Sequence, residues 1–170
     1  MTNLYLDFDG VLVDTITVTY KMMDNLGISL NDRENVIKFY QQLNWYQLLE
    51  NISEINNSFY NIRLLKELGS YNLNILTTVN SLEEIKAKIS YIRSKDKDIN
   101  VISVPKGIEK ADAVKAKNAI LVDDYSGNLK LWKNKGGIPI KFSSEINKEY
   151  ITINNLNSLT NKKLIKKLTK

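Results

Sequence analysis

Short apolar runs alternate with amphipathic segments along most of the chain. The apolar runs are rich in Leu, Ile and Val and are bounded by turn residues, which is typical of buried strands. The predicted strands are 4–6, 72–78, 100–104, 119–123 and 138–142. The segments after the second strand have helical spacing, and the helices predicted there are 81–94, 109–117 and 126–135. Alternating strands and helices predict an α/β fold with five parallel strands and helices on both faces of the sheet.

Helices without any intervening strand are predicted between the first and second strands. They cover residues 15–26, 32–48 and 54–68. Asp14 is a candidate amino-terminal cap of the first helix, and Gly27 follows it as a helix terminator. This block interrupts the alternation and predicts an insertion, whose last helix is expected to lead back into the main body.

Two other helices are expected to bury one apolar face. The helix over 81–94 opens with a capping box, Ser81-Leu82-Glu83-Glu84, and its apolar face is expected to hold Leu82, Ile85, Ile89 and Ile92. The last nine residues, 162–170, hold five lysines and no acid. Leu164, Ile165 and Leu168 share one helical face, so a terminal helix is expected to dock on the body with its lysines in water. Binding of nucleic acid or anionic lipid by this basic tail stays open.

The composition limits the available chemistry. The chain of 170 residues is long enough for one domain with a real core, and it contains no cysteine and no histidine. Disulfides, thiolate catalysis, the usual zinc ligand and the commonest general base are therefore excluded. The formal net charge is +5, which the five tail lysines supply in full. No apolar run approaches the roughly 18 residues that cross a bilayer, and the first strand begins almost at once, so we expect a cytoplasmic protein without a signal peptide or membrane partner.

Polar side chains stand at the carboxyl ends of three predicted strands, which meet at one edge of a parallel sheet. They are Asp7, Asp9, Thr77, Thr78, Asp123 and Asp124. Alternate residues of a strand share a face, so Asp7 and Asp9 are expected to point to the same side, where a cation would relieve their repulsion. Oxygen ligands favour Mg²⁺ as that cation. Gly10 lets the chain leave the strand sharply and bring its amides close to a bound anion.

The string Asp7-Phe8-Asp9-Gly10-Val11 resembles the first signature of the haloacid dehalogenase-like phosphohydrolases, which is DxDG followed by Thr or Val. The resemblance implies a Rossmann-like core formed by residues 1–14 and 69–170. It also implies a helical cap over residues 15–68, which would cover the site and select the substrate. A receiver domain of a signalling relay also gathers acids and a lysine beside Mg²⁺, but it needs neither the long helical insertion nor the early signature.

The resemblance assigns roles to the acids. Asp7 would be the nucleophile that attacks phosphorus, and Asp9 would be the acid/base that protonates the leaving oxygen. Mg²⁺ would be bound directly by Asp124, by one oxygen of Asp7 and by the backbone carbonyl of Asp9. Asp123 would lie in or just behind this set of ligands.

The family also uses a hydroxyl and a lysine to bind and neutralise the phosphate. The matching hydroxyl is that of Thr77, with Thr78 as a second contact. Lys106 and Lys110 both lie between the third and fourth strands. Lys110 is favoured because it begins the helix before the fourth strand, and the other would be a solvated surface lysine. Many relatives carry a further acid where this chain has Asn128, which would change how the catalytic lysine is held.

Within the family, the chain most resembles the small deoxyribonucleotidase-like phosphatases. The matching segments are Ile75-Leu76-Thr77-Thr78, Leu121-Val122-Asp123-Asp124-Tyr125, Asn128-Leu129, Trp132 and Gly136-Gly137. The resemblance implies Mg²⁺-dependent hydrolysis of nucleoside monophosphates through an aspartyl-phosphate. The alternatives are a phosphatase for sugar or metabolite phosphates and a non-catalytic phosphate-binding module. The aromatic residues of the predicted cap are Phe39, Tyr40, Trp45, Tyr46, Phe59 and Tyr60. Most of them are expected to pack in the core, and one or two are expected to stack on a nucleobase.

Overall fold

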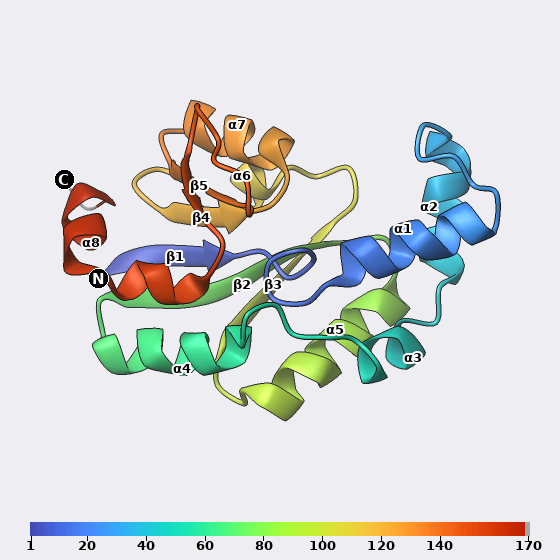
Figure 1. Cartoon of the computed structure of the whole chain (residues 1–170), viewed down its shortest axis with the longest axis horizontal. Helices are drawn as coiled ribbons and strands as arrows, with labels where there is room; N and C mark the ends of the chain where they lie inside the picture. Colours follow the sequence, from blue (N-terminus) through green and yellow to red (C-terminus); the bar gives the residue numbers. More distant parts are fainter. Residues whose placement is uncertain (169–170) are drawn as a thin grey trace.

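A computed structural model of the protein describes residues 1–168. Its centre is one sheet of six strands in the order β3-β2-β1-β4-β5-β6 (Figure 1). The strands are β1 (Thr2–Leu6), β2 (Tyr71–Val79), β3 (Asn100–Pro105), β4 (Ile120–Asp123), β5 (Ile138–Phe142) and β6 (Ile151–Ile153). Every neighbouring pair is parallel. The expected α/β fold with a parallel sheet is therefore confirmed, with the earliest strand in its interior.

The predicted number of five strands was wrong, because β6 adds a sixth at one edge. It pairs with β5 through Ile140 with Ile151 and Phe142 with Ile153. The strand is only three residues long. A run of Ile-Thr-Ile is too short for hydrophobic alternation to separate it from a loop.

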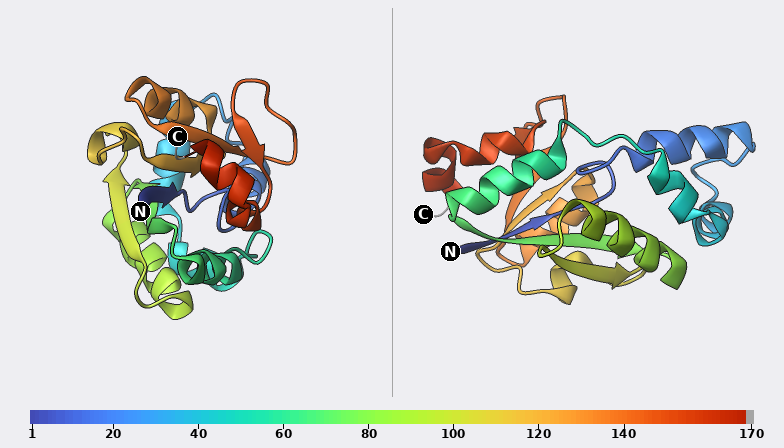
Figure 2. Two further views of the ribbon diagram at one scale, coloured as in Figure 1. Left: turned by 90° about the vertical axis from the view of Figure 1, so that its left-hand side faces the viewer. Right: turned by 90° about the horizontal axis from the view of Figure 1, so that it is seen from below.

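Helices cover both faces of the sheet (Figure 2). One face is covered by α4 (Ser58–Leu68), α5 (Leu82–Lys95), the 3-10 helix η1 (Leu156–Thr160) and α8 (Lys162–Leu168), and the other by α6 (Lys110–Ala113) and α7 (Ser126–Asn134). Leu4 and Leu6 belong to the core cluster of the first face, whereas Tyr5 between them belongs to that of the second. The central strands are apolar at successive positions because both of their faces are buried.

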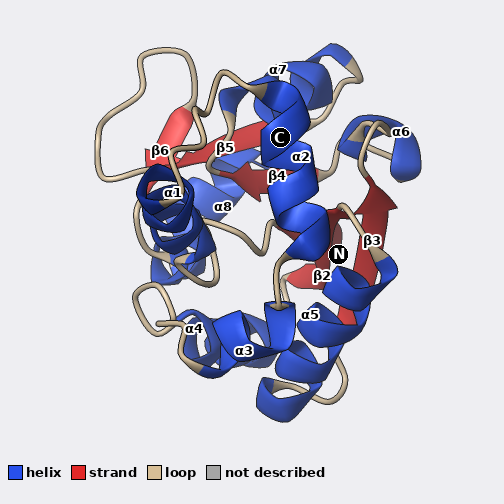
Figure 3. Ribbon diagram, turned by 90° about the vertical axis from the view of Figure 1, so that its right-hand side faces the viewer, coloured by secondary structure: helices blue, strands red, loops and turns tan. Residues whose placement is uncertain are grey.

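Three further helices lie beyond the carboxyl ends of the strands, where α2 crosses in front of the sheet (Figures 1 and 3). They are α1 (Thr15–Asn25), α2 (Arg33–Gln42) and α3 (Trp45–Glu50). The single helix predicted over 32–48 was wrong, because the backbone of Leu43 is extended and Asn44 begins a new helix. The Asn44 side chain accepts a hydrogen bond from the Gln47 amide at 3.1 Å, which caps α3.

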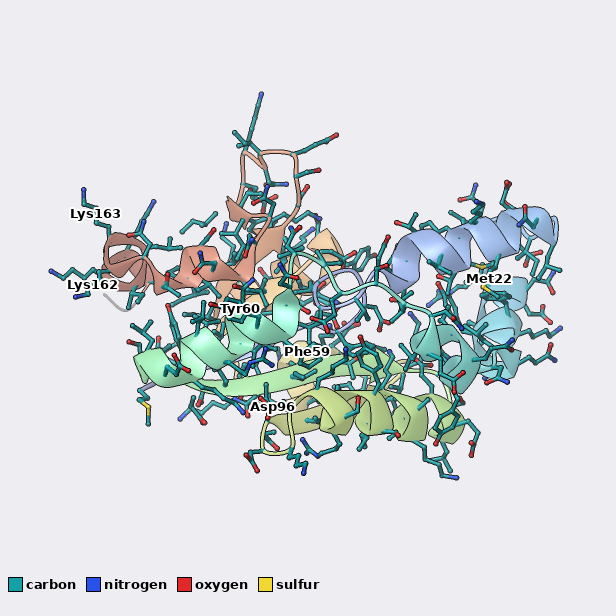
Figure 4. The ribbon with its side chains drawn as sticks, turned by 60° about the horizontal axis from the view of Figure 1, so that its bottom comes forward. Met22, Phe59, Tyr60, Asp96, Lys162 and Lys163 are labelled. Carbon is teal, nitrogen blue, oxygen red and sulfur yellow. The ribbon has the colours of Figure 1, made fainter. Side chains whose placement is uncertain are left out.

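The helix α4 begins at Ser58, four residues later than predicted, because Asn56 and Asn57 have positive φ angles of 48° and 55°. Its buried face belongs to the core cluster on the sheet. The Phe59 side chain of α4 lies on the side of that helix that faces α5, where its ring contacts that of Tyr91 at a centroid distance of 6.0 Å (Figure 4). The division into a core of 1–14 and 69–170 and a cap of 15–68 stays a prediction, and these contacts favour counting α4 with the core.

The apolar face predicted for the helix after β2 was wrong at Leu82 and Ile89, although Ile92 is buried as expected and Ile85 is half-buried. Leu82 is 72% exposed and Ile89 is 38% exposed, whereas the buried residues of α5 are Glu84, Ala87, Lys88 and Ile92. The helix is rotated so that a charged pair faces inward, toward the ends of the strands. The next helix, α6, is shorter than the predicted 109–117 because the backbone becomes extended at Val114.

The predicted docking of the terminal helix is confirmed. Leu168 is buried in the core cluster, and Leu164 and Ile165 pack against it. Lys162 and Lys163 point away from the body (Figure 4). Lys170, counted in the basic tail, lies outside the described residues. Within residues 1–168, no helix has the length and apolar character needed to span a bilayer.

Candidate active site

Three acids from two strand ends meet at the carboxyl edge of the sheet. Asp7 directly follows β1, and its amide donates to the carbonyl of Val122 at 3.0 Å, so the β1–β4 pairing continues to the site. Asp123 ends β4 and Asp124 follows it. One carboxylate oxygen from each of Asp7, Asp123 and Asp124 lies within 4.8 Å of the other two. Parallel topology thus brings together acids that are more than a hundred residues apart in the chain.

Lys110 joins two of these acids. Its Nζ lies 2.8 Å from Asp7 Oδ1 and 2.8 Å from Asp123 Oδ2, and its side chain is buried. The Asp123 carboxylate also accepts hydrogen bonds from the Tyr125 amide at 2.8 Å and from Asn128 Nδ2 at 2.9 Å. Asn128 therefore holds Asp123, and Lys110 is held by the two carboxylates rather than by residue 128.

The Asp124 carboxylate is placed differently from that of Asp123. Within residues 1–168 it accepts no hydrogen bond and forms no ion pair, although it lines the same site. Lys141 donates instead to the backbone carbonyl of Asp124. The Asp124 carboxylate is thus available to a further ligand, while Asp123 is occupied by protein donors.

Burial and mutual repulsion dominate the electrostatics of the acids. Burial raises the pKa of Asp7 well above its ordinary value; Lys110 opposes this shift, while Asp123 and Asp9 add to it. Burial, reinforced by Asp123, raises the pKa of Asp124 to about 6. Burial lowers the pKa of Lys110, but the neighbouring Asp7 and Asp123 outweigh it and the net pKa is raised. The cluster has more carboxylates than ammonium groups, an imbalance that a divalent cation would correct.

Gly10 makes room for Asp124. Its φ angle is +74°, and a Cβ at this position would lie 2.5 Å from Asp124 Oδ2. Its amide donates to the carbonyl of Val13 at 2.9 Å, so this amide is not free to bind an anion. The short distance to Asp124 explains why a residue without a side chain is needed at position 10. Gly10 is therefore not included among the phosphate-binding residues of the proposed site.

Asp9 belongs to a second charged cluster. Lys88 Nζ lies 2.5 Å from Asp9 Oδ2 and 2.7 Å from Glu84 Oε1. Thr15 Oγ1 donates to the other oxygen of Asp9, Oδ1, at 2.7 Å. Sequence reasoning missed Lys88, Glu84 and Thr15. The only signal was the four-residue spacing of Glu84 and Lys88, which usually marks an exposed helix pair.

The two hydroxyls and the second candidate lysine occupy different places. Thr78 lines the cavity above the acids, whereas the buried Thr77 side chain accepts a hydrogen bond from Lys88 at 3.1 Å. Lys106 is exposed and lines the cavity without a carboxylate partner among residues 1–168. Lys110 is therefore the lysine in contact with the acids.

The cavity holds about 370 Å³ and lies between the strand ends and the helices α1, α2 and α3. Asp7, Asp9 and Asp124 line it together with Tyr40 and Trp45. The rings of Tyr40 and Trp45 are stacked at a centroid distance of 6.1 Å. Of the other aromatics named within residues 15–68, Phe39 and Phe59 are buried, and Tyr46 and Tyr60 are exposed. Tyr20 and Tyr125 also line the cavity and were not predicted to do so.

The chain resembles known proteins in its structure rather than in its sequence. No protein-family model and no curated protein matches the chain. A HAD hydrolase of family IA, variant 3, from Entamoeba histolytica HM-1:IMSS superposes with a TM-score of 0.66 at 15% identity, covering 100% of both chains. A Had-superfamily hydrolase from Ehrlichia chaffeensis superposes with a TM-score of 0.61 at 16% identity, again over 100% of both chains.

The chain has the haloacid dehalogenase-like fold. A further solved structure with this fold is the D,D-heptose 1.7-bisphosphate phosphatase from B. bronchiseptica, complexed with magnesium and phosphate. It has a TM-score of 0.59 and 11% identity, and the alignment covers 98% of this chain and 99% of that one. In the haloacid dehalogenase-like fold of this chain, the clustered acids stand at the carboxyl edge of the sheet, where parallel sheets bind their ligands.

Proposed function

We propose that this protein is a Mg²⁺-dependent phosphatase that hydrolyses small phosphate monoesters through a phosphorylated Asp7. The observation that carries the proposal is the arrangement around Asp7. Its Oδ1 lies 2.8 Å from a buried ammonium, and its carboxylate lies within 4.8 Å of those of Asp123 and Asp124, in a cavity that a small ester can enter. The haloacid dehalogenase-like fold supports this assignment, as does a magnesium and phosphate complex of a phosphatase with that fold.

The donor set fits Mg²⁺. All candidate ligands are oxygens, which suits a hard cation, and the Asp124 carboxylate lacks a protein donor within residues 1–168. The ion would be held by the carboxylates of Asp7 and Asp124 and by the backbone carbonyl of Asp9, with Asp123 orienting Lys110 behind them. Bound there, Mg²⁺ would offset the negative charge of the phosphate and of the acids.

The proposed reaction has two steps. In the first, a carboxylate oxygen of Asp7 forms a bond to phosphorus while the ester P–O bond breaks. The protonated Asp9 carboxyl gives its proton to the leaving oxygen, which departs as an alcohol. In the second, the Asp9 carboxylate takes a proton from a water whose oxygen attacks phosphorus. The bond to Asp7 breaks, inorganic phosphate forms, and Asp9 is again protonated.

Other side chains bind the phosphate rather than react with it. Lys110, in contact with Asp7, places positive charge beside the attacked group. Thr78 lines the cavity and is the hydroxyl best placed to donate to a phosphate oxygen. Thr77 is engaged with Lys88, so its contribution would be indirect.

We propose nucleoside monophosphates, especially deoxynucleotides, as the first substrate candidates. The cavity of about 370 Å³ has room for a ligand of that class. The half-buried Tyr40 offers aromatic surface in the cavity for a base to stack on, and the buried Trp45 packs behind its ring. A phosphatase for sugar or metabolite phosphates is the second candidate, favoured by the polar Asn80 and Lys106 that also line the cavity.

The test is phosphate release from a panel of deoxynucleoside, ribonucleoside and sugar monophosphates, with Mg²⁺ and with a chelator. We expect release that requires Mg²⁺, is lost with the chelator, returns when the ion is restored and is fastest for deoxynucleotides. Release from sugar phosphates alone would refute the nucleotide preference but keep the reaction. No release from any ester in the presence of Mg²⁺ would refute the phosphatase.

A further inference from the structure

Lys88 is a buried cation whose role the proposed reaction leaves open. Its side chain is only 1% exposed. Four oxygens surround its Nζ: Asp9 Oδ2 at 2.5 Å, Glu84 Oε1 at 2.7 Å, Thr77 Oγ1 at 3.1 Å and the Thr78 carbonyl oxygen at 3.2 Å. An ammonium has three hydrogens, so these oxygens occupy every donor it has.

The partner on its own helix does not explain this placement. Glu84 lies one turn before Lys88 on α5 and is 2% exposed, so the pair is already neutral without Asp9. Asp9 adds a second carboxylate and leaves the cluster with a net negative charge. A lysine that only compensated Glu84 would need no contact with a strand-end acid, because one well-placed counter-charge suffices for a buried ion.

Aromatic rings fix Lys88 from both the core and the cap. The Nζ lies 5.4 Å from the ring centroid of Phe8, which stands between Asp7 and Asp9 in the chain. It lies 4.8 Å from the ring centroid of Trp45, the first residue of α3. Both distances are within the range of cation–π attraction. The ammonium therefore lies between the end of β1 and α3.

Asp9 is in turn held at both of its oxygens. Lys88 donates to Oδ2, and the Thr15 hydroxyl lies 2.7 Å from Oδ1. A hydroxyl can accept as well as donate, so Oδ1 can carry a proton without losing this partner. The Asp9 side chain is 19% exposed and lines the cavity beside Asp7.

We propose that Lys88 is a positioning residue for Asp9: it fixes the rotation of the Asp9 carboxyl so that Oδ1 can transfer a proton to the leaving oxygen. The inference rests on the proposed phosphatase activity and deepens it. Lys88 has no contact with the nucleophile Asp7, so its effect on proton transfer is proposed to pass through Asp9. Removal of the Lys88 ammonium should slow the hydrolysis of esters whose leaving group must be protonated. It should have little effect on the hydrolysis of esters whose leaving group departs as a stable anion.

The test compares Lys88→Met with the parent on an alkyl phosphate and on p-nitrophenyl phosphate. The value of kcat/KM is measured because it reports the step in which the ester bond breaks. We expect a loss of about 100-fold for the alkyl ester and less than about 5-fold for the aryl ester, since proton transfer contributes mainly to the former. Lys86→Met is the matched control: it makes the same substitution two residues away at a side chain that is 62% exposed, and it should leave both values unchanged.

A second variant separates positioning from stability, because Lys88→Met leaves Glu84 buried without a counter-charge. Glu84→Gln/Lys88→Met removes both charges and should show the same difference between the two esters. In an Asp9→Asn background, Lys88→Met should cause no further loss of kcat/KM that is specific to the alkyl ester. The reason is that residue 9, through which Lys88 acts, can then no longer donate a proton.

The outcomes distinguish this inference from the proposed function. An equal loss on both esters, no loss on either, or a double variant that does not fold would assign Lys88 to stability and overturn the positioning role. A parent protein that hydrolyses neither ester would overturn the phosphatase itself, and with it the reaction that Lys88 is proposed to serve.

Discussion

Two buried lysines lie beside the same strand end, and each is held between two carboxylates. Lys110 bridges Asp7 and Asp123, which come from the ends of two different strands. Lys88 bridges Asp9 and Glu84, and Glu84 belongs to the same helix as Lys88 itself. The first cluster is thus assembled by the topology of the sheet, and the second by one turn of a helix that reaches a strand end.

The two lysines share their electrostatics but not their partners in the reaction. For each of them burial lowers the pKa, two adjacent carboxylates outweigh this effect, and the net pKa is raised. Both are therefore ammonium groups at neutral pH. The difference is that Lys110 contacts the proposed nucleophile, whereas Lys88 contacts the proposed acid/base. The two lysines therefore carry the same charge, and they differ in the acid that each one contacts.

The largest effect should come from Asp7→Asn, which removes the group that both steps of the reaction require. We expect phosphate release to fall by at least about 10⁴-fold, as for the loss of other nucleophiles. Asp112→Asn, at an exposed acid paired with Lys135, is the control and should keep the parent rate. Release by a folded Asp7→Asn at the parent rate would show that Asp7 is not the nucleophile.

Lys110→Met sharpens the contrast with Lys88→Met. Lys110 offsets charge at the attacked phosphate, so kcat/KM should fall by about 10²- to 10³-fold for alkyl and aryl esters alike. Steady-state kinetics on the two esters used for Lys88 measures this directly. A loss confined to the alkyl ester would mean that Lys110 also acts through Asp9, and the two clusters would then have the same role.

Gly10→Ala probes the space that the Lys110 cluster leaves for a metal. The new Cβ would lie 2.5 Å from Asp124 Oδ2 and displace this carboxylate. We expect Mg²⁺ affinity to fall by about 10- to 100-fold, as when other supports of metal ligands are removed. Gly69→Ala is the control: its φ of +65° carries a similar backbone cost, but no atom lies within 4 Å of the added carbon. Equal Mg²⁺ affinities in titrations of the two variants would contradict the placement of Asp124 at the metal.

The smallest effect is a pH dependence of metal stabilisation. The pKa of Asp124 in the folded protein is raised to about 6, above the ordinary carboxyl value. Between these two values the folded state binds more protons than the unfolded state, so this group lowers stability as pH rises toward neutral. Mg²⁺ bound to the ionised form should reverse that loss.

Thermal unfolding with and without Mg²⁺ at pH 5 and pH 7.5 measures this difference. We expect the increase in Tm caused by Mg²⁺ to be larger at pH 7.5, where Asp124 is ionised in the free protein. The raised pKa of Asp7 acts in the same direction. An increase that is equal at both pH values, or larger at pH 5, would contradict a metal site built on these acids.

The same two clusters show what could be predicted from the sequence. The choice of Lys110 over Lys106 comes from resemblance to the family, whereas Asp7 and Asp124 follow apolar runs whose ends parallel strands must bring to one edge. Their proximity therefore follows from the alternation of strands and helices. Lys88 carries no such signal, because a Glu and a Lys four residues apart on a helix are usually solvent-exposed. Only the packing of α5 shows that this pair faces Asp9.

The other differences also arise where local pattern is weak. The break between α2 and α3 depends on the cap formed by Asn44, which the apolar spacing of 32–48 conceals. The strand β6 is too short to show a period. The inward rotation of α5 exposes Leu82, which the spacing of apolar residues had placed inside. Long buried strands and their ends were predictable, and short elements and helix rotations were not.

The most direct test of the central claim is mass spectrometry of the peptide that contains Asp7, after the protein is quenched in acid during turnover with Mg²⁺. We predict the mass of one phosphoryl group on Asp7, absent with a chelator and absent in Asp7→Asn. An unmodified Asp7 in every sample quenched during rapid Mg²⁺-dependent hydrolysis, or a phosphoryl group on another residue, would contradict it.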